Sequence, residues 1–139
     1  MRAAFELFDH TADIGIRVRA ASLPELVAPA AEGLYAVIGE MAVRGEPVRA
    51  VWQFTGEDAG VLLRDFLAAL LATFDCDRRI VRETIVTDFT PGRLGVEANA
   101  YTLDDARSAL HREVKAVTYH ALAVTEVPGG YEATVIVDI

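Results

Sequence analysis

The chain has 139 residues, of which 53% are hydrophobic and 24% charged, and its formal net charge is −8 at neutral pH. This length and apolar content suit one domain, and we expect residues 1–139 to form it. The acidic balance disfavours stable, direct binding of nucleic acid, because the phosphate backbone carries the same charge. It favours a cation or a basic protein as partner, although solubility alone also explains it.

The longest apolar run lies within residues 61–74, is too short to span a bilayer and contains Arg64 and Asp65, so no membrane segment is expected. The N-terminus begins with an alternating stretch and lacks the apolar segment of a secretion signal. Cys76 is the only cysteine, which excludes an internal disulfide. Together these features favour a cytoplasmic protein.

Two strands are predicted first, at residues 3–9 and 13–20, because apolar and polar side chains alternate there. The polar link between them, Asp9-His10-Thr11-Ala12-Asp13, contains several potential ligands. Asp13 can bind a cation or cap the loop through backbone N–H groups, and without other context capping is the commoner role.

A helix is predicted from Ser22 to Ile38, with a capping box formed by Ser22 and Glu25. A strand follows at residues 47–54. The second helix is predicted at about residues 57–74, and its apolar residues cover much of its circumference, which indicates deep burial. An exposed turn is expected at residues 75–79.

The remaining sequence alternates again and predicts strands at residues 80–90, 94–101, 112–127 and 131–139, with a helical turn expected within residues 102–109. Runs of strands combined with two separate long helices predict the α+β class. We expect a single domain in which both helices pack on one face of a mainly antiparallel sheet.

The predicted strand at 112–127 adjoins a polar stretch. On a strand, four side chains would share one face with Val117: His111, Glu113, Lys115 and Tyr119. Such a face can bind a partner or a phosphate, or it can be an ordinary solvated face. Lys115 is notable because it is the only lysine in the chain.

At the C-terminus an apolar strand is followed by Asp138 and Ile139, so two negative charges are adjacent and need solvent, a cation or a basic group nearby. Several enzyme classes are disfavoured, because the chain has no glycine-rich phosphate loop, no H-E-x-x-H and no serine elbow. The three histidines and many carboxylates could still build a hydrolytic metal site, which is the main enzymatic alternative.

Five motifs resemble those of the archease family and occur in order over nearly the whole chain. They are F-D-H-T-A-D-I-G at 8–15, S-L-P-E-L at 22–26, L-L-A-T-F-D at 70–75, E-V-K-A-V-T-Y-H at 113–120 and V-I-V-D-I at 135–139. The resemblance implies an α+β protein that is not an enzyme. It implies a partner of RtcB-type RNA ligases that promotes ligase guanylylation and multiple turnover in tRNA splicing or RNA repair.

The resemblance also implies a divalent cation, with calcium expected, held by Asp13, Asp138 and the terminal group of Ile139. These groups supply only part of the oxygen shell that such a cation needs, so water or partner oxygens must complete it. Two alternatives stay open: a metal-dependent hydrolase that uses Asp13, Asp138 and a histidine, and a general chaperone or adaptor whose metal is structural.

Contact with the ligase or its nucleotide is expected from four other polar residues: His10, Glu113, Lys115 and Tyr119. For Lys115, the plainer alternative is a paired lysine whose stem packs on the surface.

Overall fold

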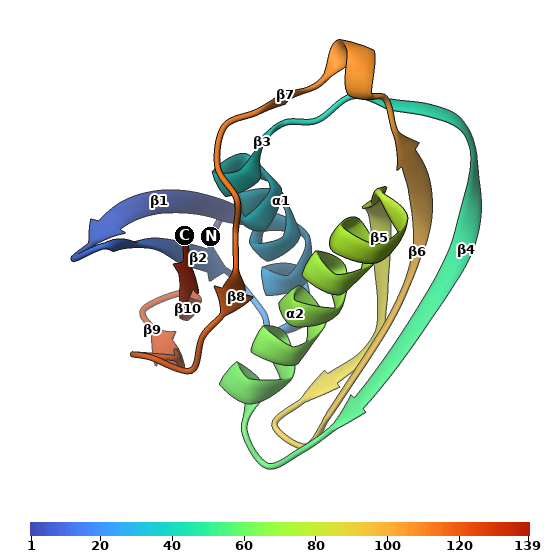
Figure 1. Cartoon of the computed structure of the whole chain (residues 1–139). Coiled ribbons are helices and arrows are strands. Elements are labelled where there is room, and N and C mark those ends of the chain that lie inside the picture. The colour runs from blue at the N-terminus through green and yellow to red at the C-terminus, as the bar shows by residue number, and fades with distance from the viewer.

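The computed structural model describes residues 1–139, and its strands form antiparallel sheets on either side of two long helices (Figure 1). Five strands form the larger sheet: β1 (Ala4–His10), β2 (Asp13–Ala20), β8 (Ala116–Val117), β9 (Ala123–Val127) and β10 (Gly130–Asp138). Their order is β1-β2-β10-β8, and β9 pairs with another part of β10. On β2, Ile14, Ile16 and Val18 are buried, as the alternating sequence predicts.

A three-stranded sheet has the order β4-β6-β5. Its strands are β4 (Val43–Thr55), β5 (Arg79–Thr90) and β6 (Arg93–Leu103). Two short strands, β3 (Gly39–Glu40) and β7 (Ala109–Leu110), pair separately, and a 3-10 turn occupies Asp105–Arg107. In Figure 1 the three-stranded sheet curves along the side of the helices opposite to the five-stranded sheet.

The helices are α1 (Val27–Ile38), preceded by a 3-10 turn at Pro24–Leu26, and α2 (Ala59–Asp77). α1 packs on β1 and β2, whereas α2 packs on the three-stranded sheet and also contacts β8 and β9. Asp58 caps α2, because its carboxylate accepts hydrogen bonds from the backbone N–H groups of Gly60 (2.6 Å) and Val61 (3.3 Å). No helix combines the length and the apolar content that crossing a membrane requires.

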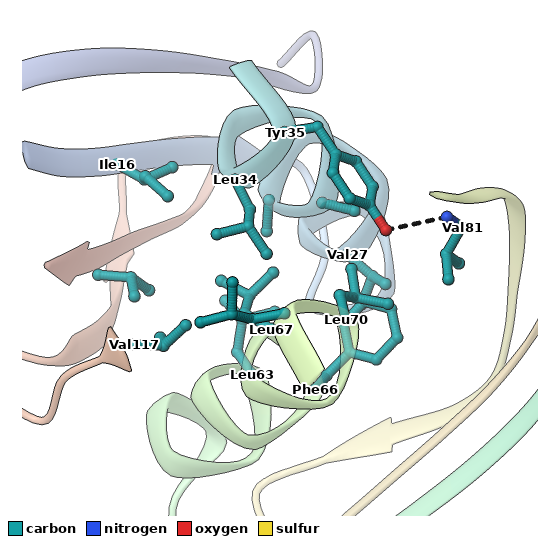
Figure 2. Close-up of a cluster of buried hydrophobic side chains, with 14 of the residues drawn as sticks. Ile16, Val27, Leu34, Tyr35, Leu63, Phe66, Leu67, Leu70, Val81 and Val117 are labelled. Atoms are coloured by element: carbon teal, nitrogen blue, oxygen red, sulfur yellow. Dashed lines mark hydrogen bonds between the residues drawn. The ribbon is translucent and has the colours of Figure 1, made fainter. Parts of the chain in front are cut away.

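A single hydrophobic core of 32 buried residues joins both helices to both large sheets. Figure 2 shows Leu34 of α1 facing Leu63 and Leu67 of α2. The Tyr35 hydroxyl accepts a hydrogen bond from the backbone N–H of Val81 (2.9 Å), which links α1 to β5. Burial raises the pKa of Tyr35 to about 12.

The predicted α+β class, with two long helices and mainly antiparallel strands, is confirmed. Both helices contact the inner face of the five-stranded sheet, and the three-stranded sheet covers them from the other side. The sequence pattern did not divide the strands between two large sheets, because alternation reports which side chains face inward and not which strands pair.

The helix boundaries differ in detail from the prediction. The capping box does not form, because the Ser22 hydroxyl donates to the Glu25 carboxylate (2.9 Å) and no side chain caps the first turn. The second helix, α2, continues to Asp77, so the first residues of the turn expected at 75–79 are helical. Arg78 ends α2 in a left-handed conformation with φ of 52°.

The strand predicted at 112–127 is wrong. The backbone N–H groups of His111 (2.8 Å) and Arg112 (3.1 Å) both donate to the carbonyl oxygen of Ile38, so they cap the end of α1 and pair with no strand. Further along, Ala121 has a φ of 52° and the chain turns before β9 begins. Only the two residues of β8 and the five of β9 join the sheet.

Candidate functional site

The register of the five-stranded sheet brings Asp13 and Asp138 to the same place. β2 and β10 are antiparallel, and Val137 pairs with Ile14. One residue further along each strand, Asp138 and Asp13 therefore lie across from each other on the same face of the sheet. Because Ile14 and Val137 point into the core, the two carboxylates occupy the outer face.

Neither aspartate forms an ion pair, and the terminal carboxylate of Ile139 forms none either. Asp13, Asp138 and Ile139 are all partly buried, so water does not fully surround these charges. Two like charges on adjacent strands repel each other, and a cation relieves that repulsion.

The carboxylates stand beside a small apolar patch on the outer face. The Phe8 ring lies over Gly15, where any Cβ would overlap the ring. Ile136 pairs with Gly15 and is fully buried, although it belongs to the outer face and not to the main core. The Arg17 guanidinium lies over the Phe8 ring, 4.4 Å from the ring centroid. Glycine at position 15 therefore permits the packing that borders the acidic pair.

Two histidines border the same end of the sheet. His10 pairs with Asp13 in the hairpin, and its ring lies 5.1 Å from the ring of His120, measured between centroids, in an edge-to-face arrangement. The Nδ1 atom of His10 is buried and has no hydrogen-bond partner. Such a nitrogen is available to donate, accept or bind a metal according to its protonation.

Lys115 is attached to this end through its backbone, because its N–H donates to the carbonyl oxygen of Asp138 (2.8 Å). Its side chain is exposed and forms no ion pair. The strand face predicted to hold His111, Glu113, Lys115 and Tyr119 together with Val117 does not exist, since Val117 is buried and the four polar residues are exposed.

Tyr119 lies instead against α2, through a contact that the sequence did not reveal. The Arg64 guanidinium donates to the Val117 carbonyl oxygen (3.0 Å) and to the Tyr119 hydroxyl (3.0 Å), and it lies 4.3 Å from the centre of the Tyr119 ring. It also pairs with Asp65 at 2.9 Å. Arg64 thus fastens the segment between Lys115 and His120 to α2. The only sequence signal was a charged residue inside an apolar run.

The structure therefore gathers His10, Asp13, Asp138 and Ile139 at one end of the sheet, with the backbone of Lys115 beside them. No group of three His, Cys, Asp or Glu side chains lies close enough together to hold a metal ion. The two aspartates offer hard oxygen donors that suit a cation such as calcium, provided that the chain terminus and water add further oxygens.

The arrangement defines a class of small α+β protein in which two carboxylates lie across from each other on adjacent antiparallel strands. Comparison with known proteins narrows the class. Residues 5–139 match the model of the Archease protein family (MTH1598/TM1083). The Pyrococcus abyssi protein named Protein archease is 35% identical over 91% of both chains, and the one from Methanosarcina barkeri is 31% identical over 97% of this chain and 95% of the relative. The chain belongs to the archease family.

Two solved structures have the same fold as this chain. The solution structure of protein 1598 from Methanobacterium thermoautotrophicum is similar with a TM-score of 0.76 and 27% identity, covering 98% of this chain and 99% of that one. The crystal structure of a Thermotoga maritima archease, described as a possible chaperone, has a TM-score of 0.68 and 18% identity, covering 100% of this chain and 98% of that one. At that identity the second comparison shows the fold alone.

Proposed function

We propose that this chain is a non-enzymatic, metal-binding activator of an RtcB-type RNA ligase, which promotes guanylylation and multiple turnover of the ligase in tRNA splicing or RNA repair in the cytoplasm. The observation that carries the proposal is the juxtaposition of Asp13 and Asp138, without ion pairs, in a chain of the archease family. If stability alone mattered here, a basic side chain across from one of these carboxylates would make the fold more stable.

In this proposal the cation, with calcium expected, is held by Asp13, Asp138 and the terminal group of Ile139. A divalent ion supplies positive charge that neutralises the repulsion between the carboxylates. Its shell is incomplete with protein ligands alone, so oxygen atoms of the ligase or water complete it. The exposed Lys115, beside Asp138, offers a positive charge to the ligase or to its nucleotide, and His10, Glu113 and Tyr119 offer polar contacts near the same segment.

The decisive experiment is a multiple-turnover ligation assay with the purified ligase, with and without this protein. Asp13→Ala should fold normally and should lower activation at least about 100-fold, because loss of even an indirect metal partner costs 10–100-fold in affinity. Glu97→Ala is the matched control, since it removes a carboxylate from the other sheet, and it should activate fully. Full activation by folded Asp13→Ala would refute the proposal.

Two alternatives are separated by companion measurements. If the purified protein alone hydrolysed phosphate esters and Asp13→Ala abolished this activity, a metal-dependent hydrolase would replace the activator. The Thermotoga maritima archease is described as a possible chaperone. A general chaperone or adaptor role predicts that Asp13→Ala keeps its effect on the ligase and that unrelated client proteins benefit equally.

A further inference from the structure

A groove of about 610 Å³ lies on the side of the molecule where α2 ends and the segment 110–115 passes. Figure 1 shows this segment descending from β7 to β8 beside the helices. Leu110 of the segment, which is 46% exposed, contributes apolar surface to it, whereas Leu71, Phe74 and Val114 lie buried beneath its floor. The groove therefore lies between a regular helix and the irregular segment that the sequence had indicated as a strand.

Four basic side chains line this groove in a chain with a net charge of −8: Arg78, His111, Arg112 and Lys115. The first lies at the end of α2 and the other three lie on the segment. No carboxylate lies within 4.0 Å of Arg78, Arg112 or Lys115, whereas Nε2 of His111 is 3.9 Å from the carboxylate of Glu40. Positive charge without an internal partner is thus concentrated in one concave place.

Two acidic residues, Asp75 and Glu113, also line the groove. With His111 neutral, three cationic and two anionic side chains leave a small positive excess where the rest of the protein is strongly acidic. The absence of close ion pairs between these groups means that the cationic ones keep their donors free for a ligand.

The ends of the two helices do not account for the basic residues. A helix C-terminus attracts cations because its last carbonyl groups lack partners. Here the carbonyl oxygen of Ile38 already accepts the N–H groups of His111 and Arg112, and that of Phe74 accepts the N–H of Arg78 at 3.0 Å. The backbone thus caps both helix ends, so capping does not require the side chains of Arg78, His111 or Lys115, and Arg112 adds only one long contact in the last turn of α1.

The two arginines are held in place while most of their donors stay free. The Arg78 guanidinium lies 4.7 Å from the centre of the Phe74 ring, at the edge of the groove. The Arg112 guanidinium makes one long hydrogen bond, 3.5 Å, to the carbonyl oxygen of Val37. A guanidinium has five N–H donors in a planar fork that matches the oxygens of a phosphate group.

We propose that this groove binds a phosphate-bearing small molecule of the size of a nucleoside triphosphate, with its phosphates on Arg78 and Arg112 and its apolar part against Leu110. Ligand pockets typically have volumes of roughly 300–1,000 Å³ and combine apolar walls with a few polar groups. The inference goes beyond the proposed function, because it concerns binding by this chain alone and holds whether or not a ligase is activated.

The test is calorimetric titration of the protein, without ligase and with a chelator present, using ATP, GTP, inorganic triphosphate and adenosine as probes at low ionic strength. We expect the nucleoside triphosphates to bind more tightly than inorganic triphosphate, and adenosine to bind far more weakly than ATP. Arg112→Gln and Arg78→Asn should each raise the Kd for ATP by about tenfold, because each removes a charged hydrogen-bond donor from the phosphates.

Arg44→Gln is the matched control, because Arg44 is exposed on β4, has no carboxylate partner and lies outside the groove. It removes the same net charge and should leave the Kd for ATP almost unchanged. Arg78→Asn should retain the fold, because asparagine tolerates the left-handed backbone at this position. Should Arg112→Gln unfold, chemical-shift changes at Leu71 and Val114 of the unmodified protein on adding ATP still report the site.

Three results would overturn the inference. The first is the absence of measurable ATP binding by the unmodified protein. The second is an equal loss of affinity in Arg44→Gln and in the groove variants, which would indicate a general charge effect. The third is binding of a glutamate-rich peptide but not of ATP, which would assign the groove to an acidic protein segment.

Discussion

The outer faces of the two large sheets differ in how completely their charged side chains are paired. On the three-stranded sheet, the Glu83 carboxylate accepts hydrogen bonds from the Tyr101 hydroxyl (2.5 Å) and from Asn99 (2.7 Å), and these bonds hold the pKa of Glu83 below its usual value. Arg49 and Glu97 form an ion pair across β4 and β6 on the same face. These polar groups are paired with one another.

On the five-stranded sheet the pairing is incomplete. Glu6 and Arg17 form an ion pair between β1 and β2 at 2.8 Å, but Asp13 and Asp138, at the other end, form none. Both sheets face outward and both carry charge, so exposure alone does not explain the difference. The comparison teaches that the repulsion between Asp13 and Asp138 is not relieved within the protein, which is why the proposed cation would be bound at this end.

After Asp13→Ala, extending the chain beyond Ile139 should have the largest effect on this unpaired end. A tag replaces the terminal carboxylate by a peptide carbonyl, which carries only a dipole, and crowds the remaining coordination positions. We expect a C-terminal tag to weaken calcium binding by roughly 10–100-fold, and to impair ligase activation, whereas the same tag before Met1 does neither. Calcium titration and multiple-turnover ligation on both tagged forms and the untagged protein provide the test.

Equal calcium binding in all three forms would contradict a role for the terminal carboxylate. It would leave a site made only of the Asp13 and Asp138 side chains, with Ile139 contributing at most a carbonyl oxygen.

Lys115→Met should affect activation and leave the fold intact. The Lys115 side chain is exposed, and its contact with β10 is made by the backbone, which the substitution keeps. Methionine keeps an apolar stem and removes the charge. Ligase activation should fall about tenfold, while the free energy of unfolding should change by less than about 0.5 kcal/mol. Strong destabilisation in a variant that still activates the ligase would instead make Lys115 a structural residue.

Arg64→Ala should loosen the segment next to the candidate site. The variant loses the hydrogen bonds to the Val117 carbonyl and to the Tyr119 hydroxyl, at a cost of about 1–2 kcal/mol. Hydrogen exchange should accelerate at residues 117–122 and remain unchanged in β5 and β6. Arg64→Lys keeps the charge but not the planar fork, and should restore only part of the protection. Unaltered exchange at residues 117–122 in Arg64→Ala would refute this fastening role.

Tyr35→Phe tests the link between the two halves of the core. Phenylalanine leaves the backbone N–H of Val81 without its acceptor, which should lower the free energy of unfolding by about 1–2 kcal/mol at neutral pH. Chemical denaturation measures this difference. The candidate site, which lies in the five-stranded sheet away from β5, should keep its calcium affinity.

The same substitution changes the dependence of stability on alkaline pH. The pKa of Tyr35 is about 12 in the folded protein and about 10 in an unfolded chain, so folding favours the neutral phenol. Its contribution is complete below pH of about 10 and is lost as the pH rises from about 10 to about 12. Tyr35→Phe should therefore lose stability less steeply over that interval. Parallel curves for the two proteins would contradict the buried, neutral phenol.

Local patterns in the sequence were sufficient to predict the helices and most of the strands. The apolar residues that cover much of the circumference of α2 are buried as predicted, because periodicity reports directly which side chains face a core. The segment 112–127 alternates too, but the backbone donors of His111 and Arg112 are taken by the carbonyl of Ile38. Which backbone N–H groups reach the last carbonyl groups of α1 depends on the tertiary fold, so no local pattern could reveal this capping.

Sequence reasoning singled out Asp13 and Asp138 separately, and only the family resemblance joined them into one candidate site. The proximity of Asp13 and Asp138 depends on the register between β2 and β10, which is set by the whole sheet. Their roles as ligands remain a prediction. Arg64 was missed because its partners, Val117 and Tyr119, lie on a distant segment. The groove was missed for the same reason, since α2 and residues 110–115 meet only in the folded protein.

The pairing of β2 with β10 has a consequence for how the molecule assembles. These strands come from opposite ends of the sequence, so closing their contact restricts nearly the entire chain at once. Contacts of such long sequence separation slow folding, whereas helices and hairpins such as β5–β6 form quickly. The acidic pair therefore exists only once β10 has paired with β2, and a partly folded intermediate that lacks β10 in its place cannot present it.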